Sequence, residues 1–105
     1  MKERPLRLLI LCSLGTSSFF LSRRIQACAF ERGILLQIEP ASVSAPRKKA
    51  LDYDLVLLEP HVHHFQTELE KTITDIPIVP VDPRAFARMD GCAVLNQALK
   101  ALYCS

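Results

Sequence analysis

Two continuous apolar runs constrain the fold of this chain more than any other feature. Residues 8–11 read Leu-Leu-Ile-Leu and residues 55–58 read Leu-Val-Leu-Leu. Neither run alternates with polar residues, which is the pattern of strands buried on both faces. A chain with two such strands needs helices on both sides of its sheet, so the runs predict an α/β domain.

Two other segments predict strands at the edges of the same sheet. Residues 36–39 alternate between apolar and polar side chains and are followed by Pro40. Residues 76–81 carry Pro77 and Pro80, which cannot both donate to a central ladder. Central first and third strands with edge second and fourth strands give a flavodoxin-like, four-stranded parallel sheet of order 2-1-3-4, with helices on both faces.

Helical spacing of apolar residues predicts the connections. One helix is expected over residues 19–32, ended by Gly33, and another over residues 61–74. Asp82-Pro83 has the pattern of a helix N-cap, and Pro46 is expected to start a short helix through Leu51. A terminal helix is expected from the apolar stripe formed by Val94, Leu95, Ala98, Leu99 and Leu102.

Length and composition limit the classes of function. At 105 residues the chain predicts one domain over residues 1–105. A net charge of +2 with both signs scattered, and no interleaving of aromatic and basic residues, argues against nucleic-acid binding. No apolar stretch approaches the roughly 20 residues of a membrane span, so a cytoplasmic protein is expected.

Four cysteines, at positions 12, 28, 92 and 104, form no C-x-x-C pair. Because the chain is long enough to build a core and has no convincing secretory signal, reduced thiols are expected rather than disulfides. Cys28 is expected on a helix face, Cys92 in a packing role at the start of the last helix, and Cys104 at the terminus.

Cys12 opens a loop between the first buried strand and the first helix, and the candidate site is this loop. Its residues are Cys12, Ser13, Leu14, Gly15, Thr16, Ser17 and Ser18. In the predicted strand order the loop lies at the switch point between strands one and three, where α/β proteins bind ligands. Backbone amides and the helix N-terminus would favour a thiolate and hold a phosphoryl group on the sulfur, without a metal or cofactor.

Two other interpretations of Cys12 remain open. The residue can be an ordinary buried cysteine at the end of a strand. A phosphatase of the low-molecular-weight tyrosine type would place an arginine six positions after the cysteine, to clamp phosphate, but that position is Ser18. Slow hydrolysis of a thiol phosphate is therefore expected, which suits a phosphate relay.

Four motifs in this order and spacing resemble a bacterial family. They are residues 9–18 (LILCSLGTSS), 54–60 (DLVLLEP), 76–79 (IPIV) and 89–91 (MDG), the last followed by Val94-Leu95. The chain is similar to the lactose/cellobiose/chitobiose-type enzyme IIB components of the phosphoenolpyruvate-dependent sugar phosphotransferase system. The resemblance implies that Cys12 accepts a phosphoryl group from a phosphohistidine on a IIA partner. It also implies that Cys12 passes this group to a sugar held by the membrane IIC component.

The chain departs from the family pattern near the site. Glu59 replaces the usual glycine, His61 a common glutamine, and Phe19 a small hydroxyl residue. An acidic residue facing a phosphocysteine would repel it, so a regulatory or interaction module with impaired transfer is the alternative function.

The cluster His61, His63 and His64 has three interpretations. It can be a solvated helix start, a metal site without an evident acidic or thiol partner, or a source of charge near the thiol. We assign no metal ligand, and name Pro60 and His61 as the candidates for a modulating role.

Overall fold

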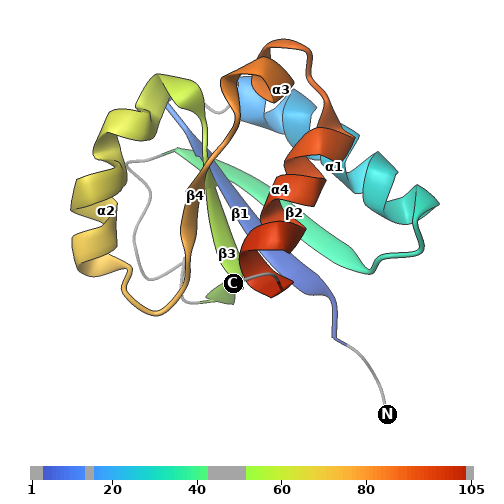
Figure 1. Cartoon of the computed structure of the whole chain (residues 1–105), viewed down its shortest axis with the longest axis horizontal. Coiled ribbons are helices and arrows are strands. Elements are labelled where there is room, and N and C mark those ends of the chain that lie inside the picture. The colour runs from blue at the N-terminus through green and yellow to red at the C-terminus, as the bar shows by residue number, and fades with distance from the viewer. Residues whose placement is uncertain (1–3, 14–15, 43–51, 104–105) are drawn as a thin grey trace.

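The structure, a computed structural model, describes residues 4–13, 16–42 and 52–103 (Figure 1). Four parallel strands form one sheet in the order β2-β1-β3-β4. Their bounds are β1 Leu6–Cys12, β2 Leu36–Ser42, β3 Leu55–Leu58 and β4 Ile78–Pro80. The predicted flavodoxin-like order 2-1-3-4 is confirmed.

Helices cover both faces of this sheet, as expected (Figure 1). On one face lie α1 and α4, and on the other lies α2. The helical elements are α1 Thr16–Glu31, the 3-10 helix η2 Pro60–Phe65, α2 Gln66–Thr72, α3 Pro83–Ala87 and α4 Gly91–Tyr103. Among the described residues, no helix is both long enough and apolar enough to cross a membrane.

Side chains of the two central strands alternate between two apolar clusters. Ile10 and Leu57 pack beneath α1 and α4, whereas Leu11 and Leu58 pack beneath η2 and α2. All residues of β3 are completely buried. Burial on both faces explains why the sequence of these strands shows no alternation.

Two expected helix ends are confirmed by their backbone geometry. Gly33 adopts a φ of 71°, and the amide of Ile34 donates to the carbonyl of Ala29 at 2.8 Å, which closes the end of α1. At the start of α3 the carboxylate of Asp82 accepts the amide of Arg84 at 3.2 Å, and Pro83 is the first helical residue.

Several element bounds differ from expectation. The second strand continues through Pro40 to Ser42, because a proline on an edge strand can turn its missing donor away from the ladder. The expected helix over residues 61–74 is instead a 3-10 helix followed by a short α-helix, with Val62 outside helical geometry. The first helix begins at Thr16 rather than at residue 19. The helix expected after Pro46 lies outside the described residues.

The expectation of reduced thiols is wrong for Cys28 and Cys92, which form a disulfide between α1 and α4. Their Cα atoms are 5.5 Å apart although 64 positions separate them in the sequence. Packing of α4 against α1 brings the two residues together, which no local motif could reveal. Cys12, in contrast, is buried and not disulfide-bonded, and Cys104 lies outside the described residues.

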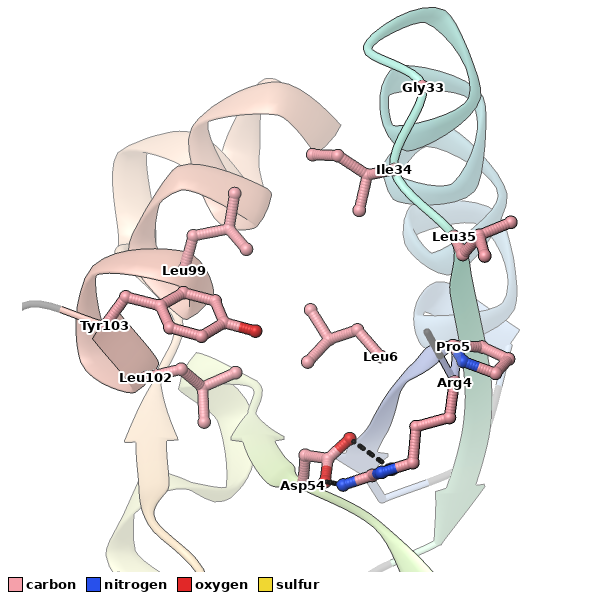
Figure 2. A pocket seen from close by; sticks show the side chains of 10 residues that line it. All are labelled: Arg4, Pro5, Leu6, Gly33, Ile34, Leu35, Asp54, Leu99, Leu102 and Tyr103. Atoms are coloured by element: carbon pink, nitrogen blue, oxygen red, sulfur yellow. Dashed lines mark hydrogen bonds and ion pairs between the residues drawn. The ribbon is translucent and has the colours of Figure 1, made fainter. Parts of the chain in front are cut away.

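A cavity of about 560 Å³ opens at the amino-terminal end of the sheet, far from Cys12. Figure 2 shows Leu99, Leu102 and Tyr103 of α4 on one side and Ile34 and Leu35 on the other. An ion pair between Arg4 and Asp54 borders it.

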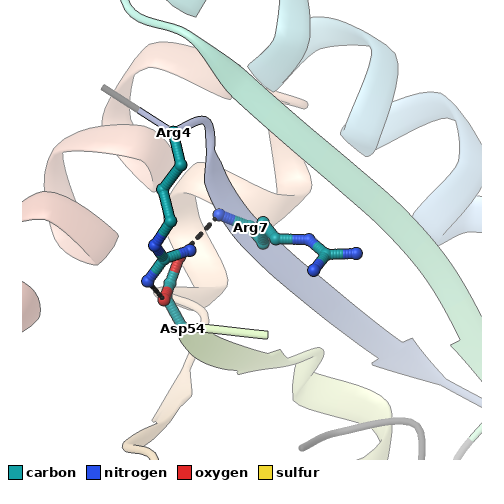
Figure 3. A network of polar contacts seen from close by, with 3 residues as sticks. All are labelled: Arg4, Arg7 and Asp54. Atoms are coloured by element: carbon teal, nitrogen blue, oxygen red, sulfur yellow. Dashed lines mark hydrogen bonds and ion pairs between the residues drawn. The ribbon is translucent and has the colours of Figure 1, made fainter. Parts of the chain in front are cut away.

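Asp54 joins the starts of β1 and β3 (Figure 3). Its carboxylate accepts from the Arg4 guanidinium at 2.6 and 3.2 Å and from the Arg7 amide at 2.8 Å. Burial opposes ionisation of Asp54, but these hydrogen bonds outweigh it and hold the pKa of the carboxyl below its usual value.

Candidate functional site

Cys12 is the last residue of β1, at the carboxyl edge of the sheet. The crossover after β1 leads to β2 on one side, and the crossover after β3 leads to β4 on the other, so Cys12 lies at the topological switch point. The helix α1 begins at Thr16, four positions later. The structure thus places the cysteine between the end of a central strand and the start of a helix.

The remaining loop residues are described only in part. Ser13 is exposed, and its carbonyl accepts a hydrogen bond from the Ser42 hydroxyl at 3.4 Å. Leu14 and Gly15 lie outside the described residues, as do the side chains of Thr16, Ser17 and Ser18. The phosphate-binding role of this loop therefore stays a prediction.

Cys12 itself is more enclosed than a residue of an exposed loop. Only 2% of its surface is exposed, because it still belongs to the sheet and pairs in register with Ser42. This burial is compatible with both the reactive and the packing interpretation of the residue.

Glu59 is the residue whose environment sequence reasoning did not foresee. It follows β3, and its amide donates to the carbonyl of Leu11 at 3.1 Å, which continues the ladder by one residue. The side chain is completely buried. The sequence predicts only that this residue faces a phosphocysteine, and a carboxylate in a loop is ordinarily exposed, so no sequence signal indicates its burial.

The second predicted loop begins η2. Pro60 is its first residue, and the exposed His61 sets its ring edge-to-face against Phe86 of α3, with 5.4 Å between the ring centroids. The Nδ1 atom of the exposed His63 is 2.7 Å from the carbonyl oxygen of Pro60. A modulating role for Pro60 and His61 stays a prediction. In the described part of the chain, no three His, Cys, Asp or Glu side chains are grouped as metal ligands would be.

An aromatic pair lies on the first turns of α1. Phe19 and Phe20 are about half exposed, and their rings meet edge-to-face at 5.7 Å. The guanidinium of Arg23 lies 5.8 Å from the centroid of the Phe19 ring. The helix that follows the Cys12 loop therefore presents an apolar surface with a cationic rim.

Comparison with known proteins matches this arrangement to one family and to two solved structures. The family model described as "PTS system, Lactose/Cellobiose specific IIB subunit" matches residues 7–97. The lactose-specific IIB component domain from Streptococcus pneumoniae superposes with a TM-score of 0.84 at 20% identity, covering 93% of this chain and 98% of the other. The solution structure of a cellobiose-specific phosphotransferase IIB component protein from Borrelia burgdorferi gives a TM-score of 0.79 at 26% identity, covering 96% and 94%.

The family match spans most of the chain, including β3, all of β1 except Leu6, and Glu59. The solved structures share the whole fold over nearly their full lengths. This chain therefore belongs to the lactose/cellobiose-specific IIB subunit family of the sugar phosphotransferase system.

Proposed function

We propose that this protein is a cytoplasmic phosphocarrier in which Cys12 accepts a phosphoryl group from a phosphohistidine on a IIA protein. Cys12 then passes the group to a sugar held by a membrane IIC permease. The observation that carries the proposal is the position of Cys12, at the end of a central strand and four residues before the start of α1, in a member of this family.

The transfer is a pair of substitutions at phosphorus. In the first, the Cys12 sulfur forms a bond to phosphorus while the phosphorus–nitrogen bond of the donor histidine breaks, and its electron pair returns to the imidazole. In the second, a sugar hydroxyl oxygen replaces the sulfur, which leaves with its electron pair. Thiolate is the reactive form in both directions.

Stabilisation of the phosphoryl group is assigned to residues 13–18. Amides at a helix N-terminus favour a bound anion, since the first turn leaves its N–H groups without carbonyl partners. The side chains of Thr16, Ser17 and Ser18 would add hydroxyl donors. Such a site needs no cofactor, because backbone dipoles supply the positive potential.

A phosphorylation assay tests this function. The protein is incubated with phosphoenolpyruvate, the general phosphotransferase proteins and a IIA protein of the lactose or cellobiose type, and phosphorylated peptides are mapped by mass spectrometry. One phosphoryl group on Cys12 is expected. Cys12→Ser should lose the label, whereas Cys28→Ala/Cys92→Ala, which lacks the disulfide, should keep it.

Two outcomes would contradict the proposal. Equal labelling of Cys12→Ser would remove the cysteine from the mechanism. An unlabelled wild-type protein, with a control IIB protein labelled in parallel, would favour a regulatory or interaction module.

A further inference from the structure

A second cavity, of about 360 Å³, lies between α1 and the turn that joins α3 to α4. Its volume is within the range of roughly 300 to 1,000 Å³ that small ligands occupy in proteins. The charged and sulfur-bearing residues that line it are Arg24, Cys28 and Glu31 of α1, with Arg88, Asp90 and Cys92 of the turn and of α4. The disulfide between α1 and α4 is therefore part of the wall of an open cavity.

The two cysteines of this disulfide differ in exposure. Cys28 is only 4% exposed, because it belongs to the core cluster beneath α1 and α4. Cys92, in the first turn of α4, is only partly buried. Thiol–disulfide exchange requires that a thiolate reach the sulfur that it attacks. A thiol that enters the cavity therefore reaches Cys92 more easily, and Cys28 is the sulfur that leaves.

The charges around the cavity favour an anionic thiol. The guanidinium groups of Arg24 and Arg88 are both exposed, and among the described residues neither of them forms an ion pair. Of the two acids, Glu31 is exposed, whereas the partly buried Asp90 accepts the Ala93 amide at 3.1 Å. The exposed charges are thus two cations and one anion. Because guanidinium groups bind carboxylates through paired hydrogen bonds, these two arginines suit a thiol that carries carboxylates.

Packing holds α1 and α4 together independently of the disulfide (Figure 1). Gly91, the residue before Cys92, lies against the backbone of Arg24 and Ile25. The side chains of Ile25 and Leu95 belong to one buried apolar cluster between the helices and the sheet. Opening the disulfide therefore leaves the two thiols close together, so that the same bond can form again.

We propose that this cavity is a thiol-exchange site, in which a small carboxylate-bearing thiol opens the cross-link between α1 and α4 through a mixed disulfide on Cys92. The disulfide form of the same reagent closes the cross-link again. The inference goes beyond the phosphocarrier function and does not depend on it, since it uses neither Cys12 nor the loop that follows. It makes the cross-link a reversible modification of the protein.

Opening consists of two exchanges in which atoms and electrons balance. In the first, the thiolate sulfur of the reagent bonds to Cys92, the bond between the two cysteines breaks, and Cys28 leaves with the electron pair and takes up a proton. In the second, another reagent thiolate bonds to the reagent sulfur of the mixed disulfide, and Cys92 leaves in the same way. The two cysteines gain two electrons, and two reagent thiols become one disulfide. Closure is the reverse, with Cys28 as the resolving thiol.

Rates of disulfide opening test the role of the two arginines. The oxidised full chain is treated at low ionic strength with glutathione, which has a net negative charge, or with cysteamine, which carries an amine. Samples are quenched with acid and blocked with N-ethylmaleimide, and the labelled Cys28 and Cys92 peptides are quantified by mass spectrometry. Arg24→Gln/Arg88→Gln should open about threefold more slowly with glutathione and no more slowly with cysteamine. Each rate is divided by the wild-type rate with the same reagent, so the intrinsic reactivity of the reagent cancels.

A matched control separates the cavity from the net charge of the protein. Arg23→Gln/Arg84→Gln also removes two exposed arginines, one from α1 and one from α3, but neither residue lines the cavity. This control should open at the wild-type rate with both reagents.

Single-cysteine variants test which sulfur carries the reagent. Cys28→Ala, which keeps Cys92, and Cys92→Ala, which keeps Cys28, are incubated with oxidised glutathione, and the modified peptide is quantified. The mixed disulfide should form about tenfold faster on Cys92 than on Cys28, because access limits the exchange. The arginine variants keep both cysteines, so they decide the question even where a cysteine variant does not fold.

Three results would overturn the proposal. One is a glutathione rate that Arg24→Gln/Arg88→Gln leaves unchanged, and another is an equal slowing in the Arg23→Gln/Arg84→Gln control. The third is a mixed disulfide that forms as fast on Cys28 as on Cys92. None of these measurements involves phosphorylation of Cys12, so this inference and the proposed function fail separately.

Discussion

Gly91 and Gly33 are both glycines for structural reasons, but the reasons differ. A Cβ atom on Gly91 would lie 2.4 Å from the carbonyl carbon of Arg24 and 2.6 Å from the amide nitrogen of Ile25. Those atoms are backbone of α1, so no side-chain rotation relieves the overlap. Gly33 has open space around it and is constrained by its positive φ alone.

Substitution by alanine should separate these two requirements. Gly91→Ala should destabilise the protein by about 3 kcal/mol, because α4 must move away from α1. Gly33→Ala should cost about 1 kcal/mol, the penalty of the left-handed conformation. Urea denaturation of both variants measures the difference, and equal losses would contradict the tight approach of α4 to α1.

At the scale of elements, the disulfide between Cys28 and Cys92 fixes α1 to the first turn of α4. It closes a loop of 64 positions that contains β2, β3, β4 and their connections. A cross-link over a loop of this length removes much of the conformational freedom of the unfolded chain.

Breaking this cross-link should lower the free energy of unfolding by about 4 kcal/mol. Thermal denaturation with and without dithiothreitol measures the loss, and Cys28→Ala/Cys92→Ala provides the control, since the reductant should leave its stability unchanged. A wild-type protein that is equally stable with and without dithiothreitol would show that the disulfide contributes nothing to the free energy of unfolding.

The elements that sequence reasoning placed well are those whose local pattern decides the outcome. The third strand has the bounds that its apolar run between Asp54 and Glu59 indicates. The sequence predicts that the second strand ends at Pro40, but the strand continues to Ser42, because whether a proline stops a strand depends on which neighbour it faces. The disulfide and the burial of Glu59 were missed since both arise from packing between segments far apart in the chain.

The candidate site, too, was predictable where a local sequence pattern decides the structure and not where packing between distant segments decides it. The strand order alone was sufficient to place Cys12 at the switch point, because the order follows from which strands are buried. The environment of Cys12 was not predictable, since the register between β1 and β3 decides that the Glu59 amide donates to the carbonyl of Leu11, the residue before Cys12.

On the scale of the whole molecule, the two ends of the sheet differ in chemistry. The carboxyl end holds Cys12 and the buried Glu59, whereas the amino end holds the ion pair of Arg4 with Asp54 (Figure 3). A carboxyl whose pKa is lower in the folded than in the unfolded protein adds stability above its unfolded pKa, near 3.8. That stability is lost as the pH falls through the folded pKa.

Asp54→Asn should therefore weaken the protein more at pH 7 than in acid. The difference in free energy of unfolding between wild type and Asp54→Asn should shrink as the pH falls from 7 toward about 2, because the folded carboxyl takes up its proton as the pH falls through its lowered pKa. Chemical denaturation across this range measures it, with the exposed Asp75→Asn as control. A difference that stays constant with pH would exclude the ion pair as its source.

Arg4 and Tyr103 line the same cavity at the amino end of the sheet, from opposite extremities of the described chain (Figure 2). Anything attached through either extremity, such as a fluorophore, an affinity tag or a neighbouring folded unit, would join the molecule at the end of the sheet opposite Cys12. A short linker between the two extremities would also close the backbone into a ring. Circularly permuted variants, with new termini elsewhere in the polypeptide, could then be made.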